Sequence, residues 1–135
     1  LLGHYYIGAN GEKLMGIGAL DHYTDKQKDH RFIGDVEIEN EETGEKYHGF
    51  ENHQGITFLG KGERPLGKVL KGHGNNGQDH TEGAIYKNVY CTYFHGPILA
   101  RNNDIAKHVL MNALKRKYPD ADLTSQEALK VGATF

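Results

Sequence analysis

His95 is the residue whose type and place in the chain most favour chemistry. It follows Val89–Phe94, a run of β-branched and aromatic residues that predicts a strand, and it precedes Gly96 and Pro97, which indicate a turn. A histidine at the point where a strand ends and a loop begins is supported and yet accessible, as the reactive groups of α/β enzymes are. The residue type alone leaves a second interpretation open, in which His95 is an ordinary turn residue.

Three further polar residues stand near the ends of predicted strands. Glu51 and His53 belong to the run Glu-Asn-His within Gly49–Gly55, which is either a polar hairpin end or part of a functional site. Arg31 precedes an alternating segment, and its residue type alone favours a solvated strand end.

The elements that must position these residues follow from hydrophobic periodicity. Arg31–Glu39 alternates apolar and polar residues, which predicts a half-buried strand, and Lys46–His53 returns after a turn as its antiparallel partner. After His95, apolar residues at helical spacing between Ile105 and Leu114 predict a helix that ends before Pro119. The other expected segments are a helix at 1–7, strands at 14–20, 56–59 and 66–70, a loop at 21–30, a polar surface loop at 72–83 and a weak helix at 125–130.

Length and composition exclude several classes of protein. The chain has 135 residues, enough for one domain, and its formal net charge of −2 gives no basic surface for nucleic acid. We expect no transmembrane segment, because no apolar run approaches the roughly 18 residues that are needed. The single cysteine, Cys91, fits a reducing cytoplasm. The nine histidines have no recognised metal-ligand spacing, so we predict neither a metal nor a cofactor.

Several motifs together resemble one enzyme family. The segment Tyr93–Asn102 resembles the catalytic-histidine segment of class I glutamine amidotransferases, in their cobyric-acid-synthase-like branch, and most of all the subunits that amidate lipid II. The same branch shares the Leu-Leu-Gly-x-Tyr-Tyr run at the start of the chain, the Arg-x-Ile-Gly-Asp run of residues 31–35 and the aromatic-Glu-x-His-x-Gly run of residues 50–55. The resemblance extends from Leu1 to about Tyr118.

The resemblance implies a fold and roles for these residues. It implies an α/β, flavodoxin-like domain, of which residues 1–135 are the C-terminal part, with antiparallel hairpin strands, a C-terminal helix, an ordered core at 1–118 and a tail at 119–135. It makes His95 the catalytic base and acid and Arg31 the residue that holds glutamine, since a guanidinium matches a carboxylate in a bidentate way. Glu51 and His53 become candidates for the pocket wall or a partner interface.

The resemblance also shows what the chain needs from elsewhere. The family's nucleophilic cysteine lies on a glycine-rich elbow that directly precedes the Leu-Leu-Gly run, so we expect the fragment alone to be inactive. Cys91 lies four residues before His95, about 13 Å away at ~3.3 Å per residue of a strand, and is expected to be a packed core residue. Where many class I enzymes have a glutamate two positions after the histidine, this chain has Pro97.

The implied function is that of a glutaminase subunit in bacterial peptidoglycan synthesis. It would supply ammonia to a Mur-ligase-like, ATP-dependent partner that amidates the D-glutamate of lipid II, and an acidic residue of that partner could complete the site. Two alternatives stay open, a cobyric-acid-synthase-type amidotransferase with a corrinoid acceptor and a non-catalytic binding scaffold. We also expect exposed sheet edges and self-association of the fragment.

Overall fold

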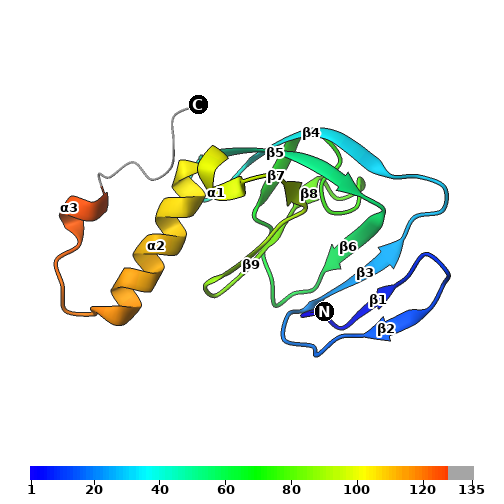
Figure 1. Ribbon diagram of the computed structural model, residues 1–135, viewed down its shortest axis with the longest axis horizontal. Coiled ribbons are helices and arrows are strands. Elements are labelled where there is room, and N and C mark those ends of the chain that lie inside the picture. The colour runs from blue at the N-terminus through cyan, green and yellow to red at the C-terminus, as the bar shows by residue number, and fades with distance from the viewer. Residues whose placement is uncertain (128–135) are drawn as a thin grey trace. The chain divides into compact units, whose positions relative to one another are not determined.

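The computed structural model describes residues 1–127 of the chain, which divide into two compact units at residues 95 and 96 (Figure 1). The first unit, Leu1–His95, consists of strands and loops, and the second, which begins at Gly96, is helical over its described residues. The described chain is therefore mixed α/β, as predicted. Each unit is considered by itself.

The largest sheet of the first unit has five strands in the order β11-β5-β4-β7-β8, and all of its neighbours are antiparallel. Its centre is the predicted hairpin, because β4 and β5 pair without interruption from Phe32↔His53 to Glu39↔Lys46. The strands span Phe32–Glu39 (β4), Lys46–His53 (β5), Gly67–Lys71 (β7), Thr81–Glu82 (β8) and Phe94–His95 (β11).

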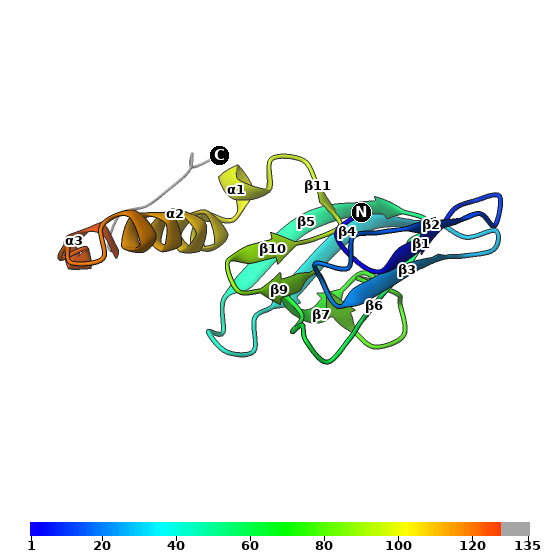
Figure 2. The ribbon, with the colours of Figure 1, turned by 90° about the horizontal axis from the view of Figure 1, so that it is seen from below.

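A four-stranded sheet in the order β2-β1-β3-β6 continues from the first, since only Gln54 separates β5 from β6 (Figure 1). In it β1 and β3 run parallel, and the other neighbours are antiparallel. A separate hairpin pairs β9 with β10, and Figure 2 shows these two strands side by side. The strands span Tyr5–Ile7 (β1), Lys13–Met15 (β2), His22–Lys26 (β3), Gly55–Leu59 (β6), Ala84–Tyr86 (β9) and Val89–Cys91 (β10).

The core of the first unit lies against the inner face of the five-stranded sheet. Val36 and Ile38 from β4 and Tyr47 from β5 are at most 2% exposed, and Leu66 and Phe94 are buried as well. The polar positions between them, such as Asp35, face outward, so the alternation of Arg31–Glu39 predicted the strand and its buried face correctly.

The prediction of a helix at Leu1–Ile7 is wrong. The backbone of the first residues bonds to a later segment: Ile17 donates to the carbonyl of Leu1 and Gly16 to that of His4. Tyr5 then continues into β1, where its ring stacks on Tyr23 with 5.0 Å between centroids. Aromatic and β-branched residues suit such a pleated surface, and this long-range pairing outweighs the helical pattern.

The loop predicted at 21–30 contains β3, and the predicted strand at 14–20 is shorter than expected. β3 has little hydrophobic alternation, and its five residues are held by full pairing with β6 from His22↔Leu59 to Lys26↔Gly55. The strand predicted at Val89–Phe94 is divided between β10 and β11, which belong to different sheets. Cys91 and His95 are therefore not on one continuous strand.

The second unit contains the predicted helix. Helix α2 spans Asn103–Lys117 and buries Ile105, Ala106 and Met111, with Asp104 in its first turn and Lys115 to Lys117 in its last. Acidic and basic residues at these ends complement the helix dipole. Short helices flank it, α1 at Ile98–Arg101 and α3 at Thr124–Glu127. The predicted weak helix at 125–130 overlaps α3 and otherwise lies outside the described residues.

None of the helices within residues 1–127 is both long and apolar enough to cross a membrane.

The two faces of β4 make a testable prediction about stability. Replacing Ile38, which is 0% exposed, with alanine should lower the free energy of unfolding by about 2–5 kcal/mol, because it leaves a cavity in the core. Replacing Ile33, which lies on the outer face of the same strand and is 57% exposed, should lower it by less than about 1 kcal/mol. Urea denaturation measures both values, and equal losses would contradict the assignment of the faces.

Candidate active site

His95 and Arg31 lie on the same outer face of the five-stranded sheet. Directly paired residues of an antiparallel ladder share a face, and His95 pairs with Phe50 of β5. Asn52, two residues further along β5, lies on the same face, and its side-chain oxygen accepts a 2.7 Å hydrogen bond from Nη1 of Arg31. A two-residue step along a strand is about 7 Å. An imidazole and a guanidinium thus lie on one exposed face, each next to a residue of β5.

The position of His95 agrees with the sequence prediction. β11 ends at His95, and the next residue, Gly96, has φ of 90°, a left-handed conformation that favours glycine. The side chain is exposed. Apolar side chains accompany it on this face, since Phe50 and Ile33 are 37% and 57% exposed.

Glu51 lies on the opposite, inner face of β5 and is 1% exposed. Its carboxylate accepts hydrogen bonds of 2.9 Å from the backbone N–H groups of His73 and Gly74 and one of 2.7 Å from Nδ1 of His73. A buried carboxylate is tolerated only with such donors. Glu51 therefore fastens the segment at residues 73 and 74 to β5.

His53 also faces inward, and it is 6% exposed. Its Nδ1 donates to the carbonyl oxygen of Gly55 at 2.7 Å, and its ring stacks on Tyr93 with centroids 3.6 Å apart and planes at 4°. Burial lowers the pKa of His53, and this effect outweighs the hydrogen bond to Gly55 and the charge of Glu51, which act in the opposite direction. The structure thus separates Glu51 and His53 from the face that holds His95 and Arg31.

The glycine-rich segment at residues 72–83 was predicted to be a polar surface loop, and this is correct only in part, because residues 72, 73 and 77–80 are exposed whereas residues 74–76, 82 and 83 are buried. Asn75, Asn76 and Glu82 are only 1–3% exposed. The side chain of Asn75 donates to the carbonyl of Gly83 and accepts from the N–H of Gly83, both at 2.9 Å. These two hydrogen bonds hold the two ends of the segment together. No periodicity marks these residues, and their burial depends on contacts with distant strands.

Glu82 is a second buried carboxyl group that sequence reasoning missed. It accepts hydrogen bonds from the hydroxyl of Thr92 at 3.0 and 3.1 Å and from the backbone N–H of Tyr93 at 2.7 Å. Burial raises its pKa to about 7, and the charge of Glu51 adds to this effect, whereas the donors from Tyr93 and Thr92 oppose it. The sequence offers one signal for it: Glu82 directly precedes Gly83, at the end of the glycine-rich segment 72–83.

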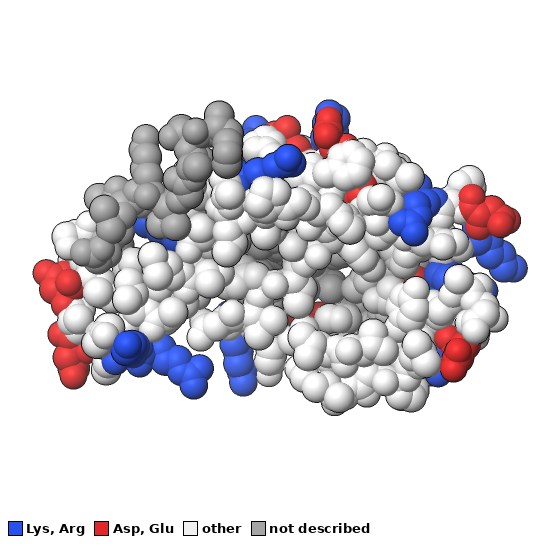
Figure 3. Space-filling model, in the orientation of Figure 1, with Lys and Arg blue, Asp and Glu red and all other residues white. Residues whose placement is uncertain are grey.

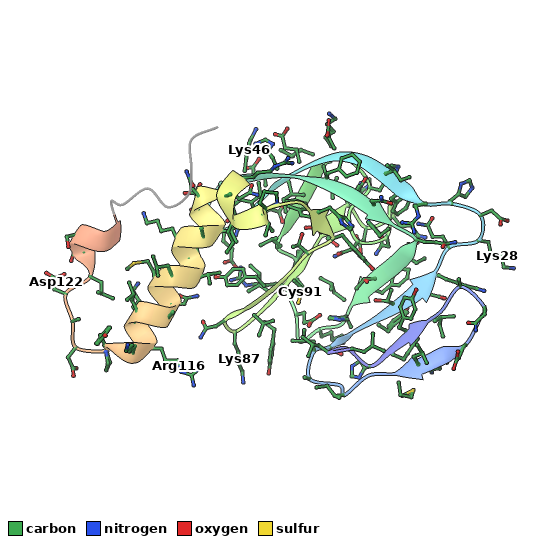
Figure 4. All side chains as sticks on the ribbon, in the orientation of Figure 1. Lys28, Lys46, Lys87, Cys91, Arg116 and Asp122 are labelled. Atoms are coloured by element: carbon green, nitrogen blue, oxygen red, sulfur yellow. The ribbon has the colours of Figure 1, made fainter. Side chains whose placement is uncertain are left out.

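Cys91 lines a cavity of about 210 Å³ between β3, β6 and the β9–β10 hairpin, and the surface is hollowed there (Figure 3). Figure 4 marks the cysteine beside this hairpin. The other lining residues include His22, Thr57, Asn75 and Tyr93. Burial raises the pKa of the Cys91 thiol, and the charges of Glu63 and Glu82 raise it further. The group is thus a protonated thiol, unlike the thiolate that a nucleophilic cysteine supplies.

Within residues 1–127, no three His, Cys, Asp or Glu side chains are grouped as metal ligands would be. Lys and Arg side chains are interspersed with Asp and Glu over the face shown in Figure 3, which fits the small net charge.

A histidine and an arginine on one exposed sheet face, with buried acids behind it, form a candidate acid–base site on an α/β domain. The chain belongs to the family of CobB/CobQ-like glutamine amidotransferase domains, whose model matches residues 1–103. This finding confirms the predicted family and fold class.

Two relatives carry the same description, "Lipid II isoglutaminyl synthase (glutamine-hydrolyzing) subunit GatD". The one from Streptococcus pneumoniae is 52% identical over 118 residues, which are 87% of this chain and 45% of the relative. The one from Staphylococcus aureus is 46% identical over 86% of this chain and 46% of the relative. A probable cobyric acid synthase from Methanosphaera stadtmanae is 40% identical over 60% of this chain and 17% of the relative. The chain spans about half the length of the two GatD relatives.

The lowered pKa of His53 predicts a dependence of stability on pH. Because its folded-state pKa lies below the usual 6.5, the unfolded chain takes up a proton more readily, and stability is lost as the pH falls below about 6.5. Replacing His53 with phenylalanine keeps an aromatic ring beside Tyr93 and removes the titrating group. The wild type should then lose more unfolding free energy than the variant between about pH 7.5 and pH 5.

Urea denaturation at the two pH values measures this difference. The variant His30→Phe, which removes an exposed imidazole, is the control. Parallel losses in the wild type and in His53→Phe would contradict the assignment.

Proposed function

We propose that this chain is the part of a glutamine amidotransferase that supplies the acid–base histidine and the arginine that holds glutamine. The observation that carries the proposal is the placement of His95 and Arg31 on the same exposed face of the five-stranded sheet, where His95 pairs with Phe50 of β5 and Arg31 bonds to Asn52 of β5. A guanidinium matches the α-carboxylate of glutamine in a bidentate way. An imidazole beside the amide end can take the proton of an attacking thiol and return it to the departing ammonia.

We place the cysteine nucleophile outside this chain. Cys91 is the only cysteine, it belongs to β10 and lines the inner cavity, and burial keeps it protonated. His95 belongs to β11 in another sheet and is exposed. The thiolate that attacks the amide carbon, and the N–H groups that stabilise the oxyanion, would come from a glycine-rich elbow on a preceding segment. The fragment alone would then be inactive.

The acceptor we propose is the D-glutamate of lipid II, amidated by a Mur-ligase-like, ATP-dependent partner in the bacterial cytoplasm. The two GatD relatives support this acceptor, because they are 52% and 46% identical to the chain, whereas the probable cobyric acid synthase is 40% identical. With Pro97 where other class I enzymes have a glutamate, an acidic residue of the partner would orient His95. A cobyric-acid-type acceptor remains the second candidate.

The remaining roles follow from the same proposal. In this proposal residues 1–118 would belong to the ordered core of a partial amidotransferase domain, and the tail expected at 119–135 lies partly outside the described residues. Glu51 and His53 stay candidates for the pocket wall or a partner interface, and their side chains lie on the inner face of β5.

We also propose that the 135-residue chain self-associates through β2, an edge strand of its sheet. Leu14 and Met15 on this edge are 43% and 70% exposed. Light scattering should detect a dimer or larger species, and Met15→Lys should shift it toward the monomer. Leu70→Lys, on the interior strand β7, should have no such effect. A monodisperse wild-type monomer would contradict the proposal.

Ammonia release from glutamine by the intact, partnered protein tests the proposed function. His95→Asn should lower kcat by at least about a hundredfold, because it removes the proton acceptor and donor. Arg31→Lys should raise KM for glutamine by about tenfold or more with a smaller effect on kcat, because the bidentate contact is lost.

Arg64→Lys is the matched control, since Arg64 is an exposed arginine that is paired with Glu42, away from Arg31 and His95. No ammonia release by the wild type would leave the binding scaffold as the better interpretation. Unchanged kinetics in His95→Asn would remove His95 from the mechanism.

A further inference from the structure

The segment Thr92–Phe94 brings the chain from the β9–β10 hairpin to His95. Thr92 and Tyr93 fall between β10 and β11 and belong to neither strand. Only the two residues of β11 are paired with β5. Ladder pairing therefore contributes little to the position of His95, and side chains must supply the rest.

The carboxylate of Glu82 organises this segment from inside the unit. It accepts the N–H of Tyr93 at 2.7 Å and the hydroxyl of Thr92 at 3.0 Å. The same hydroxyl oxygen accepts the N–H of Phe94 at 3.0 Å. The backbone N–H of Tyr93 thus donates to the buried Glu82 carboxylate directly, and that of Phe94 is joined to it through the hydroxyl of Thr92.

The side chains of the segment are held as well. The ring of Tyr93 stacks on His53 with centroids 3.6 Å apart, and its hydroxyl bonds to that of Thr57 at 2.7 Å. Phe94 lies over Gly49, where an added Cβ would stand 2.4 Å from the phenylalanine ring. Every residue between β10 and His95 is thereby fixed by a buried partner.

We infer that Glu82, acting through Thr92, is a positioning residue for His95. The inference rests on the proposed function of His95 and deepens it, since the carboxylate contacts the backbone that carries the histidine and not the substrate. An acid–base group misplaced by about 1 Å loses much of its effect on the rate while substrate binding is retained.

Thr92→Val tests the inference, because it keeps the shape of the side chain and removes the hydroxyl that joins Glu82 to Phe94. In the intact, partnered protein it should lower kcat for glutamine by roughly ten- to a hundredfold, with KM changed less than about twofold. Thr92→Ser restores the hydroxyl and should restore kcat. Glu82→Gln keeps an acceptor for Tyr93 and should lie between the wild type and Thr92→Val.

Thr43→Val is the matched control, because the hydroxyl of Thr43 also accepts the N–H two residues further on, that of Glu45 at 3.2 Å. A merely structural role of Thr92 would lower thermal stability in both variants and leave kcat unchanged in both. Equal kcat values for Thr92→Val and Thr43→Val would overturn the inference.

A measurement on the 135-residue chain separates this inference from the proposed function. Nuclear magnetic resonance of the His95 ring protons should show changed chemical shifts in Thr92→Val and the wild-type chemical shifts in Thr43→Val. If the intact protein releases no ammonia, the proposed function fails, and this comparison still decides the positioning. Unchanged His95 chemical shifts in Thr92→Val would overturn the inference.

Discussion

The antiparallel pairing of β4 with β5 is the constraint on which the rest of the structure depends. The eight pairs from Phe32↔His53 to Glu39↔Lys46 put Val36, Ile38 and Tyr47 into the core and leave Phe50 and Asn52 outside. A shift by one residue would exchange the two faces. The same register decides that His95, paired with Phe50, is exposed beside the residue that holds Arg31.

Buried carboxylates join this sheet to the loops around it. Glu51 accepts hydrogen bonds from His73 and Gly74, and Glu82 accepts them from Thr92 and Tyr93. A third, Glu63, has no exposed side-chain surface and bonds to Nδ1 of His22 at 2.9 Å. Burying a carboxylate is unfavourable unless donors compensate it, so each of them makes one loop conformation much more stable than the others. We interpret this as the means by which a small unit of short strands holds an exposed histidine in place.

Local pattern was sufficient for the elements whose stability is mostly local. The period-two alternation of Arg31–Glu39 placed β4 and its buried face, and the apolar spacing from Ile105 to Leu114 placed α2. The end of a strand before Gly96 and Pro97 placed His95. The roles expected of Arg31, Glu51 and His53 came from family resemblance, because the types of these residues fit a surface equally well.

The features that escaped prediction are those decided by contacts between distant residues. β3 has no apolar alternation and exists because β6 pairs with it. The break between β10 and β11 depends on Glu82, which lies ten residues before Thr92 and whose burial no local pattern reveals. The helix expected at the start of the chain failed for the same reason, since the carbonyls of residues 1–4 bond to residues 16–20.

The central claim is that glutamine binds on the outer face of β5 between Arg31 and His95. The most direct test is a crystal structure of the intact protein after inactivation with a diazoketone analogue of glutamine, which marks the position of the substrate covalently. The account predicts the α-carboxylate of the analogue within about 3 Å of the Arg31 guanidinium and the modified carbon beside the His95 ring. An analogue bound in the inner cavity beside Cys91, or away from both residues, would contradict it.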